Sequence, residues 1–124
     1  MKLNDLRIYN QAMEMGEFIW EIVKTWDYFS KDTLGKQLVR STDSIAANIS
    51  EGFGRYHFKD NRNFLYYARG SLYETNTWIY KAYKRHLIEE AKYSDLSAQL
   101  KDLGIKLNNY INTIGKNQTA KNNN

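Results

Sequence analysis

Apolar residues recur at helical spacing in four separate stretches of this 124-residue chain, with alternating steps of three and four in three of them. This spacing places the apolar side chains on one face of an α-helix, the face that packs against other helices in a bundle. Proline is absent and glycine occurs only seven times, so little in the chain would break a long helix. The pattern predicts an all-α fold with four helices in one bundle domain.

The first two stretches predict helices over about residues 4–29 and 34–53. The apolar run of the first is Ile8, Ala12, Met15, Ile19, Ile22, Trp26 and Phe29, and that of the second is Leu34, Leu38, Ile45, Ile49 and Phe53. Between them, Ser30, Asp32 and Thr33 offer side-chain oxygens that cap helix starts. Gly52 and Gly54 are expected to end the second helix, because glycine readily takes the left-handed conformation that closes helices.

The third and fourth stretches follow a short turn at His57. The third apolar run is Leu65, Ala68, Leu72, Thr75, Ile79 and Ala82, and the fourth, over about residues 88–114, is Leu96, Leu100, Leu103, Leu107, Tyr110 and Ile114. Gly70 costs its helix roughly 1 kcal/mol relative to alanine, which suggests close contact with another helix. We expect Gly115 to end the fourth helix.

Short loops make neighbouring helices antiparallel, so the sequence predicts an up-down-up-down four-helix bundle. We assign residues 1–115 to this bundle domain. Residues 116–124 contain no apolar side chain larger than alanine, and we expect them to form a disordered polar tail.

Several classes of function lack the residues that they require. The chain has no cysteine, and its N-terminus has no uninterrupted apolar stretch of the kind found in signal peptides, so we expect a cytoplasmic protein. His57 and His86, the only histidines, bracket the third helix at a separation of about 40 Å and cannot share a metal. Neither a Glu-x-x-His pair nor a Walker-type glycine loop occurs. We therefore expect no cofactor, no metal and no enzymatic activity.

The basic excess of the chain, a formal charge of +4, is concentrated in one region. Residues 55–86 contain seven basic and two acidic side chains, a net charge of +5. Most of these cations lie at the two ends of the third helix, and the candidates for binding phosphates are Arg55, Lys59, Arg62, Lys81, Lys84 and Arg85. One interpretation is that they bind the phosphates of RNA or another nucleic acid, and the other is that they form a solvated basic face.

Tyrosines recur every seven residues along the same helix, at Tyr66, Tyr73 and Tyr80. Aromatic rings interleaved with cations suit single-stranded nucleic acid, because bases stack on the rings while phosphates attract the cations. The same heptad spacing is also typical of helix packing, so the rings could instead fill a subunit interface. The pattern leaves both interpretations open.

A second set of polar residues falls on facing turns of the second and third helices: Arg40, Asn48, Glu51, Arg69 and Glu74. Partly buried charges are tolerated when they are paired, so one interpretation is an ion-pair network that fixes these helices or a neighbouring subunit. The other is direct contact with RNA.

The stretch from Gly35 to Thr75 carries a resemblance to a known family. The matching residues are Gln37, Leu38, Arg40, Ser44, Ile45, Asn48, Ile49, Glu51, Gly52, Gly54, Arg55, Ala68, Arg69, Gly70, Ser71 and Glu74. In these positions the chain resembles the four-helix bundle proteins encoded within intervening sequences of bacterial 23S ribosomal RNA genes, often labelled S23 ribosomal proteins. The likeness extends over about residues 6–115.

The resemblance implies a four-helix protomer assembled into a ring-like homopentamer. A related group also looks similar, the accessory variability determinant of diversity-generating retroelements, which associates with a reverse transcriptase and its template RNA. The chain departs from the family where an Arg-Arg pair is usual, since it has Val39 and Arg40 there. The loss of one arginine weakens the expectation that this face binds phosphate.

Two hypotheses follow. In the first, the chain is an oligomeric nucleic-acid-binding bundle that uses the cations and tyrosines of the third helix. In the second, it is a protein-interaction adaptor whose apolar faces assemble the oligomer and hold a protein partner. Surplus aromatic residues on the second and third helices, such as Phe53, Phe64 and Trp78, favour self-association in either case.

Overall fold

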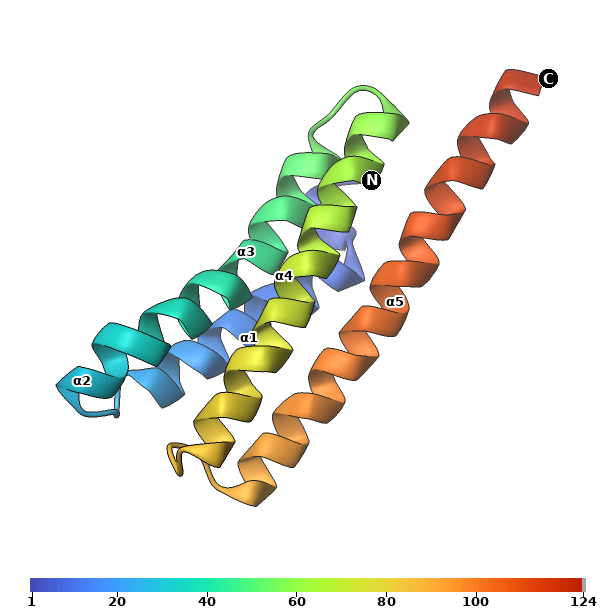
Figure 1. Ribbon diagram of the computed structural model, residues 1–124. Helices are drawn as coiled ribbons and strands as arrows, with labels where there is room; N and C mark the ends of the chain where they lie inside the picture. Colours follow the sequence, from blue (N-terminus) through green and yellow to red (C-terminus); the bar gives the residue numbers. More distant parts are fainter. Residues whose placement is uncertain (124) are drawn as a thin grey trace.

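The protein is all-helical over the residues that the computed structural model describes, which are 1–123 for the backbone and 1–114 for the side chains. A short 3-10 helix, η1 (Leu3–Asp5), precedes α1 (Arg7–Val23). The remaining elements are α2 (Tyr28–Ser30), η2 (Lys31–Gly35), α3 (Lys36–Phe53), α4 (Phe58–Lys84) and α5 (Glu90–Asn123). Because α2, η2 and α3 follow one another without a break, the chain forms four long helical rods (Figure 1).

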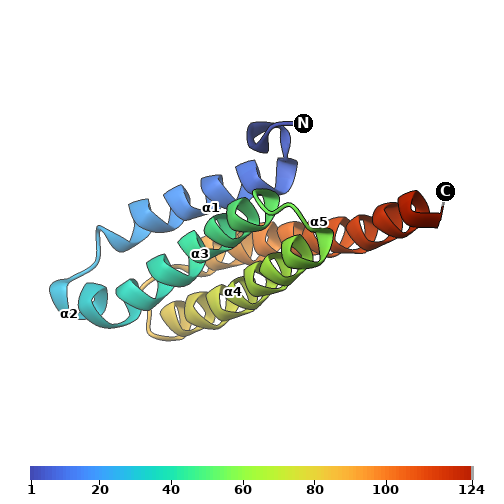
Figure 2. The same ribbon diagram turned by 90° about the horizontal axis from the view of Figure 1, so that it is seen from above.

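The four rods form an antiparallel bundle, as predicted. Helix α3 packs against both α1 and α4, α4 packs against α5, and a smaller contact between α1 and α5 closes the bundle. Figure 2 shows the same order from a second direction, with α1 and α4 on opposite sides. The up-down-up-down topology is therefore confirmed.

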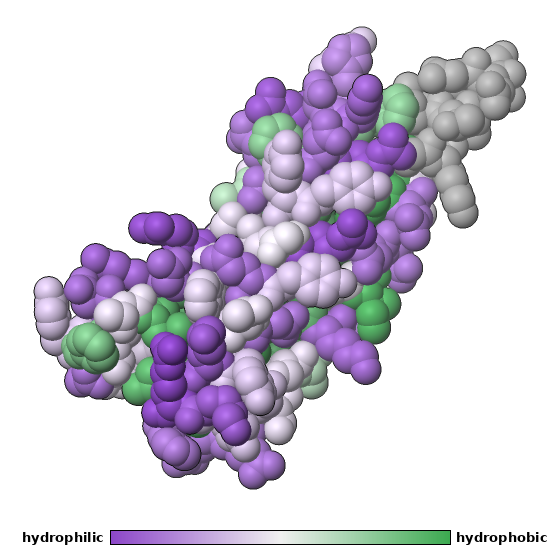
Figure 3. All heavy atoms as spheres, viewed as in Figure 1, coloured by the Kyte–Doolittle hydropathy of each residue, from purple (hydrophilic) through white to green (hydrophobic). Residues whose placement is uncertain are grey.

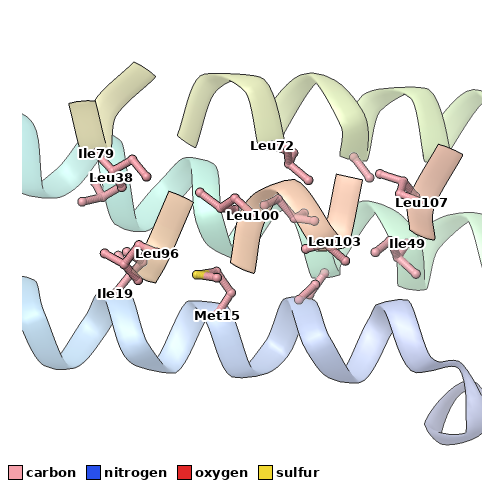
Figure 4. Packing of buried hydrophobic residues seen from close by; sticks show 14 of the residues in the cluster. Met15, Ile19, Leu38, Ile49, Leu72, Ile79, Leu96, Leu100, Leu103 and Leu107 are labelled. Carbon is pink, nitrogen blue, oxygen red and sulfur yellow. The ribbon is translucent and has the colours of Figure 1, made fainter. Parts of the chain in front are cut away.

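Apolar side chains from all four rods meet along the axis of the bundle (Figure 4). All six residues of the third predicted run are buried, as are Leu96, Leu100, Leu103 and Leu107 of the fourth. Four further members of the predicted runs are only half-buried: Ile22, Phe53, Tyr110 and Ile114. Their neighbours Val23 and Ile111 are buried instead of Ile22 and Tyr110. Burial of this core supplies the main stabilisation of the fold.

The first predicted helix is too long. Helix α1 ends at Val23, and Phe29, which we assigned to its apolar face, is 75% exposed. The cause is Asp27, whose carboxylate accepts hydrogen bonds from the backbone N–H (3.0 Å) and the hydroxyl (2.8 Å) of Ser30. These bonds lower the pKa of Asp27 and start the next rod. Asp27 therefore takes the capping role that we expected of Ser30, Asp32 or Thr33.

The helix ends do not use glycine as predicted. Gly54, at the end of α3, has a right-handed backbone with φ of −78°, and the only positive φ in the described part of the chain is that of His86, at 63°. Gly52 serves a packing purpose instead, because a Cβ there would lie 2.9 Å from the backbone oxygen of Asn61 at the start of α4. Glycine is needed at this position for close approach of two helices.

Two further glycines differ from expectation. A Cβ added to Gly70 would meet no atom within 4 Å. The prediction that another helix of the same chain lies close to this residue is therefore wrong. Helix α5 continues through Gly115 to Asn123, since a single glycine costs a helix only about 1 kcal/mol and no proline follows. The side chains of residues 116–124 lie outside the described part, and their assignment to a disordered tail stays a prediction.

Candidate nucleic-acid interface

Helix α4 presents one continuous strip of side chains away from the bundle core. At about 100° per residue, its members fall within about 100° of arc, opposite the buried run. We call this strip the outward face of α4, and it consists of Lys59, Arg62, Tyr66, Gly70, Tyr73, Thr77, Tyr80, Lys81 and Lys84. Figure 3 shows this side of the molecule, where hydrophilic side chains and pale aromatic residues predominate over α4.

The six predicted phosphate-binding cations do not form one patch. Arg55, Lys59 and Arg62 lie around the start of α4, whereas Lys81, Lys84 and Arg85 lie at its end. Lys81 follows Arg62 by nineteen positions, a separation of about 28 Å along the helix. The structure therefore separates the cations into two clusters, one at each end of α4.

In the first cluster, two guanidinium groups lie over aromatic rings. The Arg55 guanidinium carbon is 4.7 Å from the ring centre of Phe64, and that of Arg62 is 5.5 Å from the ring centre of Phe58. Arg55 also pairs with Glu51, with 2.8 Å between Nη2 and Oε1. These contacts hold both arginines in place while leaving part of each side chain accessible.

The second cluster surrounds an open groove. Lys81, Lys84 and Arg85 line it together with Asn76, Thr77 and Tyr80, and its volume is about 500 Å³. All three cations are exposed, and none forms an ion pair within the described side chains. The end of α4 thus carries three positive charges with no described carboxylate in contact.

The heptad tyrosines lie between the two clusters and outside the core. Tyr66, Tyr73 and Tyr80 are 41%, 62% and 50% exposed, respectively. The guanidinium group of Arg69 lies 4.9 Å from the ring centre of Tyr66, while the ring of Tyr80 tilts toward Tyr93 of α5 at 6.1 Å. Packing within the protomer does not account for their spacing, which is consistent with both a subunit interface and a ligand.

The second polar set does not form a single network. Glu51 pairs with Arg55, Glu74 accepts a hydrogen bond from the Trp78 indole (3.0 Å), and Arg69 donates to Asn108 of α5 (3.1 Å). Asn48 donates within its own helix to Ser44, at 2.9 Å to the carbonyl oxygen, and Arg40 is exposed on the surface. The predicted ion-pair network therefore does not form between the second and third helices within the chain, and a role of these residues toward a neighbouring subunit or RNA stays a prediction.

Hydroxyl groups connect these two helices instead. The Thr75 hydroxyl donates to the Ser41 hydroxyl (3.0 Å), and the hydroxyls of Ser44 and Ser71 lie 2.9 Å apart. Small side chains allow α3 and α4 to approach closely, and each buried hydroxyl finds a partner. Sequence reasoning missed this row because serine and threonine occur both in helix interfaces and on surfaces, and so carry no strong signal for burial.

The far side of the bundle exposes apolar side chains. Those on α1 and α2 are Met13, Phe18, Trp20, Tyr28 and Phe29. Next to Trp20, a hollow of about 550 Å³ opens between the end of α1 and the start of α3. Phe18 and Trp20 lie two residues apart in α1 and therefore point about 160° away from each other, so these side chains do not form one patch, and only Trp20 among them borders the hollow.

The described side chains contain no group of three or more histidine, cysteine or carboxylate residues able to hold a metal ion. Among the described residues, no helix combines the length and the apolar character that crossing a membrane requires.

Comparison with known proteins identifies the family. The family model described as 23S rRNA-intervening sequence protein matches residues 4–109. A crystal structure of a protein with unknown function from the S23 ribosomal protein family of Bacteroides thetaiotaomicron VPI-5482 superposes with a TM-score of 0.76. The two are 23% identical, with 84% of this chain and 97% of that chain covered, a likeness that establishes the fold. No curated protein matches. Since the family model covers most of the sequence, the chain belongs to the 23S rRNA-intervening sequence protein family.

Proposed function

We propose that the protein binds single-stranded RNA along the outward face of α4 and acts by binding rather than by catalysis. The observation that carries this proposal is the order of side chains on that face, with cations at both ends and exposed tyrosines between them. Two cationic clusters fix phosphates, and rings between them stack on unpaired bases. The expected partners beyond RNA are proteins that handle it, such as a reverse transcriptase.

The spacing of the clusters sets the expected length of the ligand. At about 3.4 Å per nucleotide of stacked strand, the span of about 28 Å corresponds to roughly eight nucleotides. A strand of this length reaches both clusters, whereas one of about four nucleotides reaches only one of them. Binding should therefore strengthen sharply between these two lengths.

Fluorescence anisotropy with labelled single-stranded RNA of graded length, over a salt series, tests the proposal. We expect wild-type affinity to fall steeply with salt and the double variant Arg62→Glu/Lys84→Glu to lose most of it. As a matched control, Lys2→Glu/Lys31→Glu makes the same change of charge at two exposed lysines outside α4 that form no ion pair among the described side chains, and should retain most of the binding. Equal loss in both variants would show a non-specific charge effect, and no wild-type binding at low salt would refute the proposal.

A second candidate function, a protein-interaction adaptor, is favoured by the exposed apolar side chains of α1 and α2. In this alternative, the side chains around Trp20 and Phe29 hold a second subunit or a protein partner, and the ring-like oligomer implied by the family is assembled through them. Light scattering of the wild type and of Trp20→Ser/Phe29→Ser tests this role. Dissociation of an oligomer by this variant supports it, while an unchanged mass contradicts it.

A further inference from the structure

A small groove between α4 and α5 has no role in the proposal above. It lies beside Tyr73, in the middle third of α4, and has a volume of about 260 Å³. Leu72 and Leu100, both buried core residues, form part of its apolar lining. The groove is small, partly apolar and open to solvent at a place where two helices run side by side (Figure 1).

Gly104 of α5 keeps this groove open. A Cβ added there would meet only the two methyl carbons of Leu72, at 3.7 and 3.8 Å, which are ordinary van der Waals distances. Alanine would fit without displacing any neighbour and would favour the helix by about 1 kcal/mol. Packing within the chain therefore does not require glycine at this position, and its effect is to leave space.

Polar groups with free hydrogen-bonding capacity line the same groove. The amide of Asn76 makes no hydrogen bond to another described side chain or backbone group, and Asn108 uses its oxygen to accept from Arg69 while its NH₂ group remains free. Lys101 is exposed and forms no ion pair among the described residues. An apolar lining with a few convergent polar groups is the usual composition of a small-ligand site.

The chemistry of these groups favours a flat, neutral ligand with hydrogen-bonding edges. The carboxamide of Asn76 presents a donor and an acceptor side by side, which matches the N6 and N7 edge of adenine, and the free NH₂ group of Asn108 adds a second donor. The exposed ring of Tyr73 offers a surface on which a base stacks, and Lys101 and Arg69 add positive charge to the lining of the groove. Uracil also places a donor beside an acceptor, N3–H next to O4, but its single ring offers less surface for stacking on Tyr73 than the two fused rings of adenine do.

We infer that the groove between α4 and α5 binds one unpaired adenine base, read by the amides of Asn76 and Asn108. This inference deepens the proposed function, because it makes the bound RNA strand pass Tyr73 with one base turned toward α5. The inference can be tested separately from the proposed function. A free nucleoside carries no phosphate, so its binding to the groove does not depend on the cationic clusters.

The test is an NMR titration of the full-length protein with adenosine, alongside uridine and ribose. We expect adenosine to shift the side-chain amide signals of Asn76 and Asn108 and the backbone signal of Gly104. Uridine should cause smaller shifts, and ribose none. Gly104→Leu, which fills the groove, should abolish the adenosine shifts, whereas Ala98→Leu adds the same side chain to an exposed position of α5 and should leave them intact.

Asn76→Ala removes an amide without filling the groove and should weaken adenosine binding about tenfold, with Asn112→Ala as the matched exposed control. Absence of adenosine shifts, or shifts that persist in Gly104→Leu, would overturn the inference even if RNA binds. Adenosine binding by a protein that binds no RNA strand would support the groove and refute the proposed function. The adenine-binding groove and the binding of an RNA strand can therefore be refuted independently of each other.

Discussion

Helix α4 carries two heptad repeats, offset from each other by one residue. Leu65, Leu72 and Ile79 face the core and are almost fully buried, whereas the neighbouring residues Tyr66, Tyr73 and Tyr80 face outward and remain exposed. Packing within the chain fully accounts for the first repeat and leaves the second unexplained. The same periodicity can therefore indicate a partner inside the protomer or one outside it, and only the three-dimensional structure distinguishes them.

The largest expected effect is the difference in stability between two variants, each with one residue of one repeat truncated to alanine. Ile79→Ala should lower the free energy of unfolding by about 2–5 kcal/mol, because it removes buried methyl groups and leaves a cavity. Tyr73→Ala should change it by less than about 0.5 kcal/mol, as expected for a surface position. Urea denaturation of both variants measures the difference. A similar loss in Tyr73→Ala would break the comparison and show that another subunit covers the outward face.

The hydroxyl row between α3 and α4 provides the next test. Thr75→Val keeps the shape of a buried side chain but removes its hydrogen bonds to Ser41 and Ser71, and should cost about 1 kcal/mol. Thr77→Val, on the outward face, removes only a 3.3 Å bond to the carbonyl oxygen of Tyr73 and should cost less. Equal losses, measured by denaturation, would contradict the importance assigned to the buried hydroxyls.

Two glycines sharpen the contrast further. Gly70→Ala should raise the free energy of unfolding by about 0.5–1 kcal/mol, because alanine favours the helix and nothing lies near the added methyl group. Gly52→Ala should lower it, because its methyl group would collide with the backbone of Asn61. If Gly70→Ala destabilised the protein or its oligomer, the outward face would have to be in close contact with another chain.

The smallest effect is expected at Asp43, at the border between α3 and α1. Burial, and then the nearby charge of Glu17, raise the pKa of Asp43 above its ordinary value of 3.8. The folded state therefore binds this proton more tightly than the unfolded state, and stability falls as pH rises from 3.8 through the raised pKa. Asp43→Asn removes this loss, so its melting temperature should exceed that of the wild type at about pH 7 but not at about pH 3.

Much of the fold could be predicted because apolar spacing reports directly on burial. The run from Leu65 to Ala82 is correct at every position. The end of α1 was missed because the apolar pattern continues through Trp26, while the carboxylate of Asp27 decides the break by a local hydrogen bond. The spacing of apolar residues does not reveal that the Asp27 side chain, rather than a backbone carbonyl, accepts the hydrogen bond of the Ser30 N–H.

The candidate site was less predictable, because it depends on the contacts of long side chains between helices. The sequence places cations at both ends of α4, yet it does not reveal that Arg55 and Arg62 lie over phenylalanine rings. It also cannot show that Arg69 reaches Asn108, since that contact requires α5 to lie beside α4 in a particular register. The groove at Gly104 depends on the same register.

The order in which the helices pack has a consequence for folding speed. Most contacts join rods that are consecutive in the chain, and only the smaller contact between α1 and α5 joins its two ends. Such low contact order predicts folding in about microseconds to milliseconds. Because chains emerge from the ribosome N-terminus first, the α3–α4 hairpin can pack on α1 while α5 is still being synthesised. The outward face of α4 would then be available to ligands before the bundle is complete.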